Sequence, residues 1–117
     1  MIIKPDDLVK TGGHYARINN YYWSVSRLID LTKDFKVKQI PIEFLDLRID
    51  LNIVSIRELA RHINQVNKAD IQYPIILDQD GVLMDGRHRI TKAIIEGKEK
   101  IPGVRFEINP HPCKVGS

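Results

Sequence analysis

The sequence predicts an α+β fold in which a small mixed β-sheet packs against helices. Short apolar runs of strand length alternate along the chain with segments whose apolar residues recur at helical spacing. The expected order of elements is strand, helix, hairpin, helix, strand, which is typical of an α+β domain. With 117 residues, the chain is long enough to bury one core but not two.

Residues 1–36 are expected to form a helical extension ahead of this domain. Their first part is polar and contains a proline and a Gly-Gly pair, with at most one helical turn at residues 6–9. Apolar residues at helical spacing follow Ser24, which predicts a short helix capped by Ser24 or Ser26. Trp23 is placed to anchor the start of that helix.

A strand and a helix are expected next. Residues 37–47 alternate and then become apolar, which predicts a strand, and Pro41 favours a position at a sheet edge or a strand end. Ser55 and Glu58 form a capping box, after which apolar residues recur at helical spacing. We therefore expect a helix that runs to about Asn67.

A hairpin, a helix and a last strand complete the expected domain. Residues 73–77 and 82–84 are apolar runs joined by Asp-Gln-Asp-Gly, whose Asp-Gly step is a strong signal for an antiparallel hairpin. A later helix is expected to end near Gly97, and residues 104–108 alternate as a strand. The tail, residues 109–117, contains two prolines and is expected to be irregular.

The composition favours a cytoplasmic protein. The net charge of +3 is compatible with polyanionic partners but is too small for a protein that coats DNA. Cys113 is the one cysteine, so it cannot form an intramolecular disulfide, and we expect an exposed, unreactive thiol. No signal peptide or run of about 18 apolar residues is present, so no membrane partner is expected.

The segment from Asp85 to Arg89 places three basic side chains where a helix is expected to begin. A helix N-terminus carries partial positive charge, so basic side chains are disfavoured there by about 0.3 to 1 kcal/mol each. A bound phosphate would reverse this effect, because Gly86 lets the backbone approach an anion and an arginine can clamp two phosphate oxygens. Gly86, Arg87, His88 and Arg89 are therefore candidate phosphate-binding residues. The alternative is that the arginines are solvated or paired with nearby carboxylates.

Four segments stand in the order and spacing of a known superfamily. They are Glu58-Leu59-Ala60-Arg61-His62-Ile63, Tyr73-Pro74-Ile75-Ile76-Leu77, Asp85-Gly86-Arg87-His88-Arg89 and Ile101-Pro102-Gly103-Val104. With them, residues 37–108 resemble the ParB/sulfiredoxin superfamily domain, in which a Gly-x-(His/Arg)-Arg loop opens a helix. The resemblance implies a ParB/sulfiredoxin-like fold and a loop that binds nucleotide phosphates, as CTP in partition proteins and ATP in sulfiredoxins. Some relatives are described as nucleases.

Two departures from the superfamily narrow the activities that the resemblance implies. Sulfiredoxins place their reactive cysteine where this chain has Arg87, and Cys113 offers no substitute, so repair of oxidised cysteine is not expected. Partition proteins continue into a further nucleotide-contacting helix and a helix-turn-helix domain, and this chain stops before either. A partition clamp with centromere recognition is therefore not expected.

The resemblance also implies that the protein binds a nucleoside triphosphate, ATP or CTP, together with Mg²⁺. Asp85 is the carboxylate best placed as a metal ligand and catalytic group, since Mg²⁺ takes one or two carboxylates besides phosphate oxygens. Glu58, Asp78 and Asp80 are weaker candidates, because a helix cap and a turn already explain them. His88 is a candidate for phosphate binding or general acid–base catalysis, because histidine titrates near neutrality.

Other residues add secondary candidates. Arg48 follows the first expected strand, where relatives often have a basic residue near the nucleotide, although an exposed strand-end charge is the alternative. His62 is expected to be a packing residue at the boundary of a helix. An aromatic concentration beside Arg17 could stack a base or a nucleic-acid strand, or could pin the N-terminal segment to the core. Its members are Tyr15, Tyr21, Tyr22 and Trp23.

The leading interpretation is a ParB-like domain that binds a nucleotide through Gly86, Arg87, His88 and Arg89, with hydrolysis or transfer of phosphate left open. A nucleic-acid-binding module or nuclease is the alternative, in which the same loop holds a backbone phosphate. A further alternative is a protein-interaction or inhibitor domain that retains the loop. The partners considered are a nucleotide, a nucleic acid, and a second copy or another protein.

Overall fold

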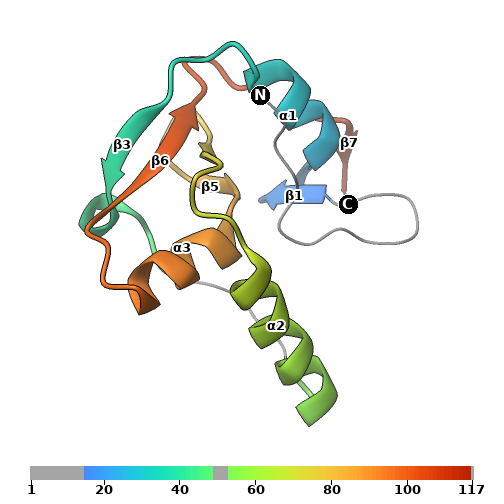
Figure 1. Ribbon diagram of the computed structural model, residues 1–117. Helices are drawn as coiled ribbons and strands as arrows, with labels where there is room; N and C mark the ends of the chain where they lie inside the picture. The colour runs from blue at the N-terminus through green and yellow to red at the C-terminus, as the bar shows by residue number, and fades with distance from the viewer. Residues whose placement is uncertain (1–14, 49–52, 117) are drawn as a thin grey trace.

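The fold is α+β, as the sequence predicts, with helices and two sheets in the residues that the structure describes, 15–48 and 53–116 (Figure 1). The structure is a computed structural model. The helices are α1 (Val25–Thr32), α2 (Ile56–Lys68) and α3 (Arg87–Ile95), and a short 3₁₀ helix, η1, covers Ile42–Phe44. The strands are β1 (Tyr15–Ile18), β2 (Tyr21–Ser24), β3 (Lys38–Pro41), β4 (Ile75–Leu77), β5 (Leu83–Asp85), β6 (Lys100–Arg105) and β7 (Lys114–Val115).

The larger sheet is mixed, and its strand order is β3-β6-β4-β5. Strands β4 and β6 run parallel, while β3 pairs with β6 and β4 pairs with β5 in antiparallel fashion. All three residues of β4 are buried, since this central strand has protein on both of its faces. The sheet therefore needs layers on both sides.

Two apolar clusters lie on the two faces of the larger sheet. On one face, Ile75 and Leu77 of β4 pack with Ile90 and Ala93 of α3. On the other face, Ile76 packs in a cluster with residues of the N-terminal segment and of β5 and β6. The members of this second cluster are Ala16, Trp23, Val25, Leu28, Ile76, Met84, Val104 and Phe106. The larger sheet is therefore enclosed by α3 on one side and by α1 with the small sheet on the other.

The predicted hairpin is confirmed as β4 and β5, and the turn between them is built around Asp78. One carboxylate oxygen of Asp78 accepts hydrogen bonds from the backbone N–H groups of Asp80 and Val82, both at 2.8 Å. Gly81 completes the turn with a φ of +85°, a conformation that glycine adopts without strain. Asp78 is buried by this arrangement, so its carboxylate serves the turn.

Two predicted strands have different bounds in the structure. The strand expected at residues 37–47 ends at Pro41, where η1 begins, and it lies at the sheet edge as the proline indicates. The strand expected at residues 104–108 is instead β6, Lys100–Arg105. Because β6 lies between two other strands and buries residues on both faces, it lacks the alternation on which the prediction depended.

The N-terminal segment contains more sheet than the predicted helical extension. Strands β1 and β2 form a hairpin, and β7 pairs with β2, so the small sheet has the order β1-β2-β7. The tail is therefore not wholly irregular. The predicted short helix is confirmed as α1, with the side chain of Ser24 accepting a hydrogen bond from the Arg27 backbone N–H. The helical turn predicted at residues 6–9 lies outside the described residues.

Helix α2 confirms the helix predicted from Ser55. The Ser55 hydroxyl accepts a hydrogen bond from the Glu58 backbone N–H at 3.1 Å, and the Glu58 carboxylate accepts one from the Val54 N–H at 3.2 Å. This helix has no buried residue, and its N-terminal end projects away from both sheets (Figure 1). Within residues 15–48 and 53–116, no helix is long and apolar enough to cross a membrane.

The junction between β5 and α3 depends on Gly86. Its φ is +124°, which side chains other than glycine rarely adopt. A Cβ atom added to Gly86 would lie 2.8 Å from the Cβ of Ile75 in the centre of the larger sheet. Glycine is therefore required here by both backbone conformation and close packing.

We predict that Gly86→Ala lowers the free energy of unfolding by about 3 kcal/mol, because it combines backbone strain with a clash in the core. Gly97→Ala is the matched control, since Gly97 also has a positive φ but has no atom within 4 Å of an added Cβ. Gly97→Ala should lower the free energy of unfolding by only about 1 kcal/mol. Urea denaturation would measure both values, and equal losses would contradict the packing argument.

Candidate anion-binding cleft

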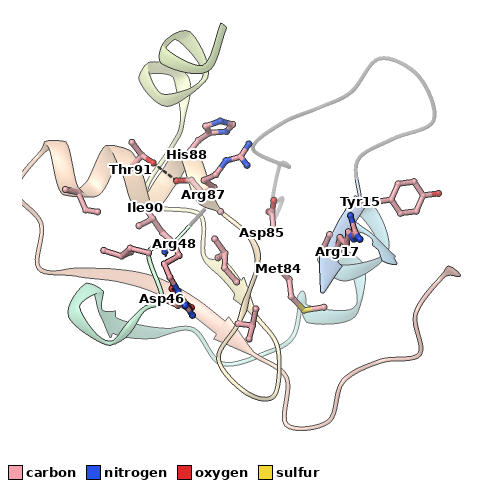
Figure 2. Close-up of a pocket in the computed structure, with 16 residues that line it drawn as sticks. Tyr15, Arg17, Asp46, Arg48, Met84, Asp85, Arg87, His88, Ile90 and Thr91 are labelled. Atoms are coloured by element: carbon pink, nitrogen blue, oxygen red, sulfur yellow. Dashed lines mark hydrogen bonds and ion pairs between the residues drawn. The ribbon is translucent and has the colours of Figure 1, made fainter. Parts of the chain in front are cut away.

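A cleft of about 410 Å³ opens at the start of α3, between β5 and β1 (Figure 2). Arg87 and His88 come from the first turn of α3, Arg17 comes from β1, and Arg48 comes from the segment that follows η1. The remaining lining residues are Tyr15, Ala16, Asp46, Leu47, Val82, Leu83, Met84, Asp85, Gly86, Ile90, Thr91 and Ile94. The cleft thus combines three segments that are far apart in the sequence, 15–17, 46–48 and 82–94.

Positive charge dominates this cleft. Three arginines line it, Arg17, Arg48 and Arg87, against the carboxylates of Asp46 and Asp85. Within the part of the chain that the structure describes, Arg87 forms no ion pair. The first turn of α3 holds no acidic residue, and no side chain caps this helix. The partial positive charge of the helix N-terminus therefore adds to that of the arginines.

Arg48, a secondary candidate from the sequence, lines the cleft, where its guanidinium is paired with Asp46. The guanidinium donates to both carboxylate oxygens of Asp46, with Nη2–Oδ2 at 2.6 Å and Nε–Oδ1 at 2.9 Å. These hydrogen bonds lower the pKa of Asp46 to about 2. Because the pair is exposed to solvent, an anion that enters the cleft can compete with Asp46 for Arg48.

His88 is buried at the edge of the cleft and contacts a second histidine. Its Nε2 lies 3.5 Å from Nδ1 of His62 on α2, and the two ring centroids are 5.7 Å apart. His62 is half-buried and was expected only to pack at a helix boundary. No local signal in the sequence connects two histidines that are 26 residues apart, so this pair could not be predicted.

Asp85 and Arg89 form a buried ion pair. The distance between Nη2 of Arg89 and Oδ2 of Asp85 is 2.6 Å, and both side chains are 2% exposed. Arg89 does not line the cleft, so this geometry gives no support to its predicted role as a phosphate ligand. The four-residue spacing of the pair, which spans the junction at Gly86, was weighed from the sequence only as an alternative.

The described residues around the cleft form no preassembled metal site. Among the residues that can be described, no three His, Cys, Asp or Glu side chains gather closely enough to hold a metal. Asp85, the predicted ligand, is engaged by Arg89, while Glu58 serves the cap of α2. Mg²⁺ that accompanies a nucleotide takes one or two carboxylates besides phosphate oxygens, so the predicted Mg²⁺ stays a prediction, and we derive no step through a metal.

The outward face of the small sheet carries aromatic and basic side chains. Arg17, Tyr22 and Lys114 stand in register across β1, β2 and β7. The Arg17 guanidinium lies 5.5 Å from the Tyr22 ring centroid, and the Lys114 ammonium lies 4.9 Å from the centroids of Tyr22 and Tyr15. The Tyr15 ring points away from Arg87 and His88 (Figure 2). Trp23, on the inward face, is buried in the core as the anchoring interpretation expects.

Cys113 has a different environment from the one expected. Its Sγ accepts a hydrogen bond from the Ser24 backbone N–H at 3.3 Å and lies 3.6 Å from Nη1 of Arg27. The Ser24 hydrogen bond, followed by the Arg27 guanidinium, lowers the pKa of the thiol. The exposed thiol is therefore more acidic than an ordinary cysteine, because folding brings the tail to the start of α1.

Comparisons with protein-family models, with curated proteins and with solved structures found no match to this chain. The resemblance of residues 37–108 to the ParB/sulfiredoxin superfamily thus stays a prediction. The chemistry of the cleft follows from its own side chains, which favour an anion.

We predict that Asp85→Asn or Arg89→Met lowers the free energy of unfolding by about 3 kcal/mol, because each leaves one member of a buried ion pair without its charged partner. The double variant Asp85→Leu/Arg89→Met is the control. It removes both charges, so its loss should be smaller than the sum of the two single losses. Additive losses in thermal or urea denaturation would show that the two side chains act independently.

Proposed function

We propose that this protein binds the phosphates of a nucleotide in the cleft at the start of α3. The observation that carries the proposal is that Arg17, Arg48 and Arg87 line one cleft, which opens at a helix N-terminus that no side chain caps. Asp46 already pairs with Arg48, but Arg87 lies at the positive end of the α3 dipole and forms no ion pair within the described residues, so an anion bound there would be stabilised. A phosphate supplies both the charge and the oxygen acceptors that arginine binds in pairs.

The size and lining of the cleft support a nucleotide over a bare phosphate. Its volume of about 410 Å³ falls within the range of about 300 to 1,000 Å³ that small-molecule sites occupy. Apolar side chains of Leu47, Met84, Ile90 and Ile94 lie beside the arginines. A mixed lining of this kind suits a ligand with one charged end and one flat, largely apolar end.

The resemblance to the ParB/sulfiredoxin superfamily supports the same proposal. In that superfamily, the Gly-x-(His/Arg)-Arg loop binds nucleotide phosphates, and the corresponding residues here are Gly86, Arg87, His88 and Arg89. In our proposal Arg87 contacts phosphate directly and Gly86 lets the backbone approach it. Arg89 acts indirectly by holding the loop through Asp85. ATP and CTP are the first nucleotides to test, and the cytoplasm, which the single cysteine favours, supplies both.

A reaction at the bound phosphate would depend on His88. Its ring borders the cleft, and its contact with His62 offers a second nitrogen for the transfer of a proton. Asp85 also lines the cleft, but its carboxylate is paired with Arg89. His88 is therefore the better candidate for acid–base chemistry, and binding is the activity that we propose.

We predict that the protein binds a nucleotide in isothermal titration calorimetry across ATP, CTP, GTP and the deoxynucleotides, both with Mg²⁺ and in EDTA. Arg87→Ala should weaken nucleotide binding about tenfold or more, because it removes at least one charge-assisted hydrogen bond to phosphate. Asp46→Asn should strengthen binding, because it releases Arg48 to the ligand.

Arg57→Ala is the matched control, since Arg57 is an exposed arginine on α2 that does not line the cleft. The Arg57→Ala variant should bind the nucleotide with the same affinity as the unmodified protein. The proposal fails if no nucleotide binds, or if Arg87→Ala and Arg57→Ala change the affinity equally.

A second candidate function is the binding of single-stranded nucleic acid, favoured by the outward face of the small sheet. Arg17, Lys114, Tyr15 and Tyr22 share this face, and it carries no acidic residue among the described ones. Cations neutralise backbone phosphates and exposed rings stack unpaired bases, which a duplex does not offer. Arg17 also lines the cleft, so a strand on this face could extend to Arg87.

This candidate predicts that a labelled single-stranded oligonucleotide binds in fluorescence anisotropy with an affinity that falls as salt rises. Lys114→Gln should reduce the slope of log affinity against log salt by about 0.7, the effect of one released counterion on a single strand. Lys36→Gln, at an exposed position outside the small sheet, serves as the control. A slope that is identical in the unmodified protein and both variants would refute a role for this face.

A further inference from the structure

Helix α2 directs mainly polar side chains toward the protein. Its half-buried residues are Glu58, His62, Gln65 and Val66, of which three are polar. A surface helix in a globular protein ordinarily buries its apolar side and exposes its polar side. In α2 this arrangement is largely reversed.

The apolar side chains of α2 form an exposed stripe, which we call the α2 stripe and define as Ile56, Leu59, Ala60 and Ile63. Ile56 is 85% exposed, Leu59 is 44% exposed and Ile63 is 52% exposed. The spacing from Ile56 to Leu59, Ile63 and then Val66 is three, four and three residues. This is the spacing of the a and d positions at which two helices pack together.

The protein body gives α2 little support. A helix of 13 residues is marginal in water when isolated, and most helical stability in proteins comes from packing of the apolar side. Here that side is in solvent, and the N-terminal half of the helix projects from the body (Figure 1). A contiguous exposed apolar patch of this kind marks an interaction surface.

We propose that the α2 stripe is the interface of a homodimer, in which the α2 helices of two copies pack against each other antiparallel about a two-fold axis. In a pair centred between Leu59 and Ala60, Ile56 lies over Ile63 of the partner subunit, and Ile63 lies over the partner subunit's Ile56. The small side chain of Ala60 lets the two helix axes approach. The stripe is therefore self-complementary, as a two-fold interface requires.

Two features favour a second copy in this antiparallel arrangement. The stripe residues are separated by three, one and three positions, a pattern that reads the same in both directions, so an identical antiparallel helix provides a fitting partner. Because the projecting half of α2 is its N-terminal half, an antiparallel pair keeps the two bodies at opposite ends of the paired helices (Figure 1). It also opposes the two helix dipoles, whereas a parallel pair aligns them.

Sedimentation equilibrium over a range of protein concentrations tests this proposal. We expect a reversible dimer of twice the 13.5 kDa chain mass, with a dissociation constant in roughly the micromolar range, since one helix pair makes a small interface. Leu59→Glu and Ile63→Glu should each weaken the dimer at least tenfold. Circular dichroism should stay unchanged, because both side chains are already exposed.

Asn64→Glu is the matched control, since it adds the same charge to an exposed position of the same helix outside the stripe. It should leave the dissociation constant unchanged. A monomer at every concentration overturns the proposal, as does a dimer that Leu59→Glu and Ile63→Glu leave intact. Nucleotide binding by Arg87 is a separate property, so a monomer that still binds nucleotide refutes the dimer alone.

The orientation has its own test in a Cys113→Ser background. Ile56→Cys combined with Ile63→Cys should form an intermolecular disulfide on mild oxidation, because these positions face each other in an antiparallel pair. The single variant Ile56→Cys should not form an intermolecular disulfide. Efficient cross-linking by Ile56→Cys alone overturns the antiparallel arrangement, since that residue meets its own copy only in a parallel pair.

Discussion

The buried ion pair between Asp85 and Arg89 is the constraint on which the geometry of the cleft depends. It connects the last residue of β5 to the first turn of α3 across Gly86, whose backbone packs against Ile75 in the central strand. The ion pair and the close packing together fix the direction in which α3 leaves the sheet. That direction decides where Arg87 and His88 point.

This ion pair also changes the argument that begins from charge at the helix N-terminus. Three basic side chains in one turn suggest an anion, but the structure gives each a different role. Arg89 is neutralised by Asp85, His88 packs against His62, and Arg87 remains at the cleft. The case for an anion therefore depends on Arg87 together with Arg17 and Arg48, which come from elsewhere in the chain.

Local patterns predicted the parts of the fold that local interactions determine. The Ser55–Glu58 cap and the Asp78–Gly81 turn are complete within a few residues, so the sequence shows them directly. The pairing of β7 with β2 and the hydrogen bond from Trp23 to the Pro110 carbonyl join residues 87 to 94 positions apart. No short pattern encodes such contacts, and so the small sheet and the position of Arg17 were missed.

The reversed orientation of α2 connects the cleft with the proposed dimer. A helix that presented the α2 stripe to the body would gain apolar burial, but it would turn His62 away from His88. Placing His62 against His88 therefore leaves Ile56, Leu59 and Ile63 in solvent, where a second helix can cover them. Packing on that exposed side would restrict the motion of α2 and so hold His62 against His88. One side of α2 thus contacts His88 and the other side is available to a second copy, and neither role can be deduced from the isolated helix.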